Sequence, residues 1–277
     1  MGELARDTTV TGGAGRYGAR LAPDWSFLTP NGGYLASIAL RAAAAEISDV
    51  GLAPASLMCH FLGVASPDAE VDLVVEPLRL ARRARSVRVR MSEGERPIVE
   101  QLVWFVDEVP GIEHDFSAMP DVPAPEALPE PPPATMFASF WGNFEARPLD
   151  LPTGGRWEDR SGGPPLWRSW YRFREDPLPA DPVVDTCRAV VLLDTLFYGA
   201  ALMAHPGRDD VFAPSLDLAV RFHRRPPYSE WLYVQTNSPT AVGGLVTGFG
   251  AVWAQDGGLV ASGGQQMLCQ LPAQARP

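Results

Sequence analysis

The sequence predicts an α+β protein of two similar halves in tandem, each with one long helix packed against an antiparallel sheet. Three observations predict this. The chain has 277 residues, whereas single domains typically have about 100–150. The same order of one long helix and four following strands occurs twice, and a proline-rich segment separates the two occurrences. We therefore predict halves at residues 1–118 and 166–277, joined by a proline-rich linker or strap at 119–165.

The first half begins with a predicted strand over 16–21 and a loop that ends in Pro30-Asn31-Gly32-Gly33. Residues 34–47 are rich in alanine and contain no interior Gly or Pro, which predicts a buried helix. The expected strands that follow cover 56–64, 70–80, 86–91 and 98–106. A tight turn over 92–96 joins the last two.

The second half repeats this order. Asp181 is expected to cap a helix over 183–203, with Pro182 at its first position. A strand over 167–174 is expected before the helix. Asp256-Gly257 predicts a hairpin turn between the last two strands of this half. The strands expected after the helix cover 215–222, 231–236, 245–253 and 259–268. A helix along one face of such a sheet is a stable layer arrangement, and the two halves are expected to share one continuous sheet.

The segment Pro120 to Ala134 has a proline at every second or third position. Proline removes backbone donors and favours an extended, polyproline-like chain. This predicts a linker or a strap on the surface. Residues 135–165 are rich in aromatic side chains and are expected to pack back on the folded halves.

The composition excludes several functional classes. The formal charge of −10 provides no positive field for nucleic acid. No window approaches the roughly 20 apolar residues of a membrane span, and residues Met1 to Val10 contain no apolar run typical of a secretion signal. A cytoplasmic protein without a membrane partner is therefore expected. The cysteines, an odd number in apolar surroundings, predict buried thiols. The histidine spacing gives no support for a metal site.

Several motifs lie in the order and approximate spacing of one known family. They are Trp25, Pro30-Asn31-Gly32-Gly33-Tyr34, Leu193-Asp194, Ser215-Leu216-Asp217, Phe222-His223-Arg224, Trp231-Leu232, Gln255-Asp256-Gly257 and Val260-Ala261-Ser262-Gly263-Gly264-Gln265. The order of elements resembles the hotdog fold. Its duplication resembles the double hotdog acyl-CoA thioesterase II family, over nearly the whole chain except the proline-rich linker.

The resemblance implies hydrolysis of acyl-CoA thioesters to free acid and CoA. In that family an Asp, a Thr or Ser, and a Gln hold the attacking water, and by position these are Asp194, Ser215 and Gln265. The chain has Ser where Thr is commoner, which keeps the hydroxyl but loses a methyl that restricts χ1. No metal or redox cofactor and no covalent acyl-enzyme is implied.

The residues themselves carry a physical argument at Asp194. Its helical neighbours Val190, Val191, Phe197 and Tyr198 are apolar or aromatic, so an unpartnered carboxylate there is costly. Burial would raise its pKa, whereas hydroxyl and amide donors would lower it. The alternative is a structural Asp bonded to backbone or to a Tyr hydroxyl. Ser215 and Gln265, each taken alone, are more typical of ordinary strand or core hydrogen bonding.

Two further features leave alternatives open. Asn31, Gly32 and Gly33 at a helix start predict substrate binding, because backbone N–H groups there can approach a thioester oxygen. An ordinary loop-to-helix turn is the alternative. A basic run of Arg79, Arg82, Arg83, Arg85, Arg88 and Arg90 either meets the CoA nucleotide or, as the pattern favours, forms a solvated strand face.

Other functions compete with hydrolysis. A noncatalytic acyl-CoA or lipid-binding hotdog protein would keep the groove without turnover. A hotdog hydratase or dehydratase is disfavoured, because no His is placed near the helix that carries Asp194. The absence of a G-x-S-x-G sequence argues against a serine α/β-hydrolase. A homodimer is expected, because the outer edges and faces of a fused sheet can still associate.

Overall fold

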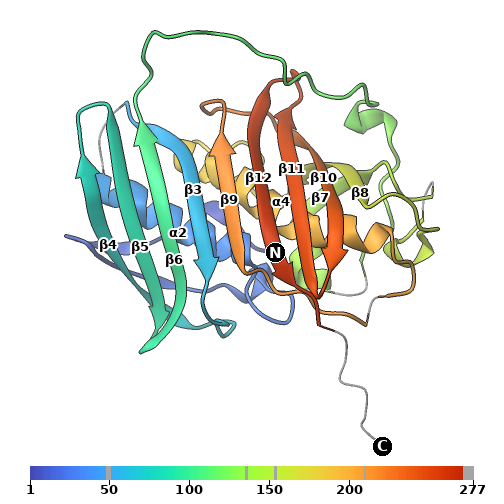
Figure 1. Cartoon of the computed structure of the whole chain (residues 1–277), viewed down its shortest axis with the longest axis horizontal. Helices are drawn as coiled ribbons and strands as arrows, with labels where there is room; N and C mark the ends of the chain where they lie inside the picture. The colour runs from blue at the N-terminus through green and yellow to red at the C-terminus, as the bar shows by residue number, and fades with distance from the viewer. Residues whose placement is uncertain (48–50, 135–136, 153–154, 209, 271–277) are drawn as a thin grey trace, which may run out of the picture.

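The computed structural model describes residues 1–47, 51–134, 137–152, 155–208 and 210–270. Within them the strands form one sheet in the order β1-β2-β4-β5-β6-β3-β9-β12-β11-β10-β8-β7, which has 12 strands. Helices α2 (Gly32–Ile47) and α4 (Pro182–Met203) lie side by side on one face of this sheet (Figure 1). The predicted α+β double hotdog architecture is confirmed.

The two halves have the same topology. The first contains β1 (Thr11–Gly13), β2 (Arg16–Arg20), β3 (Ala53–Phe61), β4 (Glu70–Leu80), β5 (Ala84–Glu93) and β6 (Arg96–Val106). The second contains β7 (Phe144–Pro148), β8 (Leu166–Phe173), β9 (Asp217–Phe222), β10 (Trp231–Val242), β11 (Leu245–Ala254) and β12 (Leu259–Leu268). The order β2-β4-β5-β6-β3 in one half matches β8-β10-β11-β12-β9 in the other. Antiparallel pairing of β3 with β9 joins them into the continuous sheet that was expected.

The sequence does not predict several short elements. Three of them are α1 (Leu4–Asp7), β1 at one sheet edge and β7 at the other. The Thr-Gly-Gly of β1 has poor strand propensity, so only its pairing with β2 makes it a strand. A fourth, α3 (Ala138–Trp141), lies with β7 in the aromatic segment that was expected to pack back on the fold.

Helix α4 begins as the sequence predicts. The Asp181 side chain accepts a hydrogen bond from Val183 N at 2.8 Å, and Pro182 occupies the first turn. The helix also corrects one expectation, because it is long and apolar enough to cross a membrane, with a mean hydropathy of 1.4 over its best window. That window is 83% buried inside the fold, so its apolar character is explained by its packing against both α2 and the sheet.

The proline-rich segment crosses from the end of β6 to the far side of the second half (Figure 1). It covers an aromatic cluster on the sheet face opposite the helices, formed by Trp170, Trp231, Tyr233 and Trp253. Two indole N–H groups hold it there. Trp253 Nε1 donates to Ser117 O at 2.9 Å, and Trp170 Nε1 donates to Pro123 O at 3.0 Å. The segment therefore acts as a strap whose carbonyls satisfy the tryptophans beneath it.

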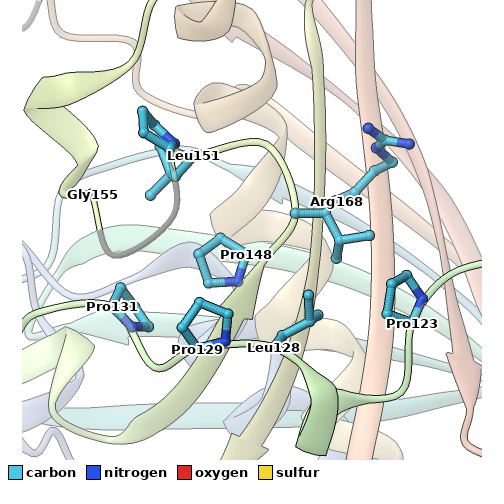
Figure 2. Close-up of a pocket in the computed structure, with 10 residues that line it drawn as sticks. Pro123, Leu128, Pro129, Pro131, Pro148, Leu151, Gly155 and Arg168 are labelled. Atoms are coloured by element: carbon cyan, nitrogen blue, oxygen red, sulfur yellow. The ribbon is translucent and has the colours of Figure 1, made fainter.

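A small cavity of about 230 Å³ lies between the strap and the β7–β8 region. Figure 2 shows Pro123, Pro129, Pro131 and Pro148 around it, with Arg168 at one side. The Arg168 guanidinium is paired with Asp150 at 2.6 Å. The cavity is thus a packing gap among stiff proline rings, beside an ion pair that is already satisfied.

Candidate active site

Asp194 lies in the middle of α4 with 7% of its surface exposed, facing the N-terminus of α2. Its Oδ2 accepts a hydrogen bond from Asn31 Nδ2 at 2.9 Å and another from Gly33 N at 2.8 Å. Both donors come from the other half of the chain. The carboxylate therefore lies at the interface between the two halves.

The second oxygen of Asp194 faces the sheet of its own half. Oδ1 accepts from Ser215 Oγ at 3.2 Å and from Gln265 Nε2 at 2.9 Å. The same Gln265 amide also contacts Ser215 Oγ. Ser215 precedes β9 and forms an isolated bridge with Met267 of β12, which brings it beside Gln265. The structure thus brings the three predicted catalytic residues into contact with one another.

Opposing effects set the charge of this carboxylate. Burial raises the pKa of Asp194 to about 6, while hydrogen bonds from Gly33 N, Ser215, Gln265 and Asn31 lower it. A carboxyl group with this pKa is ionised at neutral pH and can still accept a proton. Such tuning is typical of general bases. The structural alternative predicts a backbone or a Tyr hydroxyl partner. A backbone partner, Gly33 N, is present, whereas the other partners found are side chains of Asn31, Ser215 and Gln265.

The glycine pair explains how α2 comes so close to α4. A Cβ at Gly33 would lie 2.8 Å from both Val190 O and Val191 Cα. A Cβ at Gly32 would lie 2.8 Å from Phe61 Cζ and 2.9 Å from Asp194 Oδ1. At Gly33 the conflicting atoms belong to the backbone of α4, so only glycine fits there, and the close approach lets the Gly33 N–H reach the carboxylate.

Asn31 has more partners than the sequence suggests. Its Oδ1 accepts from Tyr34 N at 2.9 Å and so caps α2, while its Nδ2 donates to Asp194 and to Thr195 Oγ1, the latter at 3.1 Å. Thr195 was not singled out from the sequence. Its hydroxyl donates to Val191 O at 2.7 Å, a common pattern for a helical Thr, so no local motif marks it.

The first turn of α2 carries the backbone donors proposed for the substrate. Helix N-termini leave their first N–H groups without intrahelical partners. The Gly33 N–H is used by Asp194 and the Tyr34 N–H by Asn31. Among the described residues no partner is found for the Gly32 N–H. Of the predicted substrate-binding residues, Gly32 is therefore the one whose backbone N–H can donate a hydrogen bond to a substrate.

The basic run lies far from this site. Strand β3 ends at Phe61, whose ring lies beside Gly32 and therefore beside the site. The turn between β4 and β5, which the basic run spans, lies at the opposite end of the sheet (Figure 1). Arg85 Nη1 donates to Ile47 O at 3.2 Å, and Ile47 ends α2. The 16-residue α2 spans about 24 Å, at 1.5 Å per residue. Arg88 is paired with Glu100 at 3.0 Å. This placement favours the solvated strand face over contact with the CoA nucleotide.

Metal and thiol chemistry receive no support from the described part of the chain. There, no group of three or more His, Cys, Asp or Glu side chains could hold a metal ion. Cys59 and Cys187 are buried free thiols, and burial raises the pKa of Cys187 to about 12. Both are therefore neutral and unreactive at physiological pH.

Two family descriptions match the chain in succession. The acyl-CoA thioesterase N-terminal domain matches residues 21–106, and the acyl-CoA thioesterase C-terminal domain matches residues 118–269. The chain belongs to the acyl-CoA thioesterase family. The resemblance seen in the motifs is thereby confirmed, and so is the enzyme class, a thioester hydrolase.

Relatives of known name share this family and fold. Human acyl-coenzyme A thioesterase 8 is 26% identical over 263 residues, covering 88% of this chain and 81% of its own. The crystal structure of acyl-CoA thioesterase II TesB2 from Mycobacterium marinum has a TM-score of 0.81 at 25% identity, covering 98% and 99% of the two chains. The tesB protein of Mycobacterium avium subsp. paratuberculosis superposes with a TM-score of 0.79 at 22% identity, covering 96% and 98%.

Proposed function

We propose that this thioesterase hydrolyses acyl-CoA by means of a water held by Asp194, Ser215 and Gln265. One observation carries the proposal. Gln265 donates its Nε2 to the carboxylate, which leaves its buried Oε1 without a partner among the described residues. An unsatisfied buried acceptor is costly, and a water that donates to both Gln265 Oε1 and Asp194 Oδ1 would satisfy it.

The contact with Ser215 leaves room for this water. At 3.2 Å the Ser215 hydroxyl is the most distant of the described donors to Asp194. A hydroxyl both donates and accepts, so Ser215 can accept from Gln265 Nε2 and turn its own proton from Asp194 to the oxygen of the water. The three side chains then fix the water oxygen with a lone pair directed at the substrate.

The reaction follows from this arrangement. The water oxygen attacks the thioester carbonyl carbon while Asp194 takes a proton from the water. The Gly32 N–H at the start of α2 is proposed to donate to the carbonyl oxygen as negative charge develops there. When the carbon–sulfur bond breaks, the proton on Asp194 passes to the leaving sulfur. The products are a carboxylic acid and CoA, and Asp194 is again ionised.

Release of free thiol from acyl-CoA tests this function directly. Catalytic turnover is expected with the purified chain alone, without added metal. A noncatalytic acyl-CoA carrier would bind the substrate, seen as heat in a calorimeter, but would release no thiol. That outcome would exclude hydrolysis as the function of this chain.

Ser215→Ala and Gln265→Ala should each lower kcat, and each by less than the loss of Asp194. Each removes one group that holds the water and leaves the base in place. Combining either with Asp194→Asn should add little, since residues that act on one water behave as a unit. Steady-state kinetics of the single and double variants measure this. Losses that add in free energy would contradict a shared water.

The pH dependence should report the carboxylate. Since burial raises the pKa of Asp194 to about 6, a protonated acid predominates below that pH and cannot accept a proton from water. We expect kcat/KM to rise tenfold per pH unit below about 6 and to level above it, because one proton must leave the free enzyme. Initial rates at several pH values, with folding checked by circular dichroism, test this. A flat profile from pH 4.5 to 8 would contradict the assignment.

The proposed homodimer has a candidate surface on the sheet face opposite the helices. Cross-strand partners there form the row Leu102, Met58, Ala219, Gly264 and Phe249. Met58 and Phe249 are 55% and 52% exposed. Ala219, Gly264 and Phe249 are among the residues that line a trough of about 500 Å³. We expect light scattering to give the mass of a dimer and Phe249→Lys to shift it to monomer. A parent chain that is monomeric at high concentration would exclude this assembly.

The predicted domain boundaries and the predicted cellular location also remain proposals. The division into parts at 1–118, 119–165 and 166–277 describes the two sheet halves and the segment that carries the strap, although β7 of that segment joins the sheet. A cytoplasmic location fits the free cysteines of the described chain.

A further inference from the structure

The aromatic ring of Phe197 fills the space between α4 and the sheet, beside the candidate active site. Gly248 of β11 is the cross-strand partner of Gln265, so the two positions face the same side of the sheet. A Cβ at Gly248 would lie 2.5 Å from Phe197 Cβ. One at Gly250, the next position on this face, would lie 3.0 Å from Phe197 Cε1. The Phe197 side chain therefore lies along β11, over two positions where this strand has no side chain.

Phe197 is also tied to the reacting carboxylate by the helix. It follows Asp194 by three positions, so both side chains project from the same side of α4. Its exposed fraction is 0%. Thr236 Oγ1 of β10 donates to Leu196 O at 3.0 Å, which fixes this turn of α4 against the sheet. The ring is thus held between two rigid elements and does not lie in a mobile loop.

The position of the opening decides which part of the substrate meets this ring. Gly32, Ser215 and Thr195 are partly exposed, whereas Phe197 is fully buried. Solvent therefore reaches the site from the side of Gly32 and Ser215. The phosphates of CoA are strongly hydrated and remain on that side. The acyl chain leaves the thioester carbon in the opposite direction, so it points inward, towards Phe197.

From this geometry we infer that Phe197 closes the inner end of the acyl site and limits the enzyme to short acyl groups. The inference rests on the proposed function of Asp194, Ser215 and Gln265. A chain longer than the space in front of the ring must displace the ring from a tightly packed contact with β11. Close-packed interiors resist such displacement, and a methylene without room in a hydrophobic pocket typically costs about tenfold or more in kcat/KM.

The unaltered enzyme gives the first test. Thiol release is measured for straight-chain acyl-CoA from acetyl to palmitoyl, below the concentration at which the longer members form micelles. We expect kcat/KM to fall by at least tenfold between butyryl and octanoyl substrates. Palmitoyl-CoA hydrolysed as efficiently as butyryl-CoA would overturn the inference. Release of no thiol from any member would instead refute the proposed hydrolysis itself.

A variant gives the second test. Phe197→Leu removes part of the ring and should raise the octanoyl-to-butyryl ratio of kcat/KM at least tenfold relative to the parent. The ratio is measured within one sample, so it does not depend on the fraction of folded protein. Phe173→Leu is the matched control, since Phe173 is 2% exposed and packs against Trp25 and Phe144. A ratio unchanged in Phe197→Leu, or changed equally in Phe173→Leu, would overturn the role of Phe197.

Discussion

Asp194→Asn should lower kcat by about 10²–10⁴-fold, the usual range for a general base. The variant removes the charge that takes a proton from water. The amide of the variant has an NH₂ group where the parent has an oxygen that accepts hydrogen bonds, so this NH₂ group would face other donors. The site can adapt if the NH₂ group takes the place of Oδ1. There the Ser215 hydroxyl can turn to accept, and the Gln265 amide can flip to present its oxygen. The fold and the affinity for acyl-CoA should therefore be retained, as thermal unfolding and calorimetry would show.

Asp185→Asn provides the matched control for this experiment. Asp185 is also a buried carboxylate of α4, 1% exposed, and it pairs with Arg188 at 2.7 Å. Breaking that pair leaves a buried charge uncompensated, so stability should fall while kcat of the folded fraction is kept. A parent-like kcat in Asp194→Asn would mean that this helix carboxylate is structural. A similar loss of kcat in Asp185→Asn would mean that the effect is not specific to the site.

The fold could be predicted from the sequence because local pattern and tertiary structure agree in this chain. Both helices and the main strands were found, with small errors at the ends. The largest shifts occur where the sheet is irregular. Strand β3 begins at Ala53 although Pro54 follows, and β10 continues past Pro239 to Val242. A register shift lies at each proline, and such irregularities accommodate a residue that cannot donate to the ladder.

The site could be predicted only in part, because its partners lie far apart in the chain. Asp194 stands out as a carboxylate among apolar neighbours, and the ordered motifs point to Ser215 and Gln265. The contact of Asn31 with Asp194 spans 163 residues. It depends on how closely two helices cross, which no local pattern specifies. Thr195 was missed for the same reason, since its bond to Asn31 exists only after the halves have docked.

Gly33→Ala should damage both stability and activity, because Gly33 lies where the two helices touch. The added Cβ would lie 2.8 Å from Val190 O and Val191 Cα, backbone atoms that cannot rotate away. Overpacking of this kind costs about 1–3 kcal/mol. In a chain of this size that corresponds to a fall of roughly 2–12 °C in the unfolding midpoint. Calorimetric or circular-dichroism melting measures it.

The same substitution should also reach the reacting carboxylate. Moving α2 away from α4 weakens the bond from Gly33 N to Asp194 Oδ2, now 2.8 Å long. A hydrogen bond to a charged group contributes about 1.5–3 kcal/mol, so kcat should fall by roughly 10–100-fold. Gly111→Ala is the control, because a Cβ at Gly111 meets nothing within 4 Å, and it should melt and turn over like the parent. If Gly33→Ala did the same, the close contact between the helices would not be what positions Asp194.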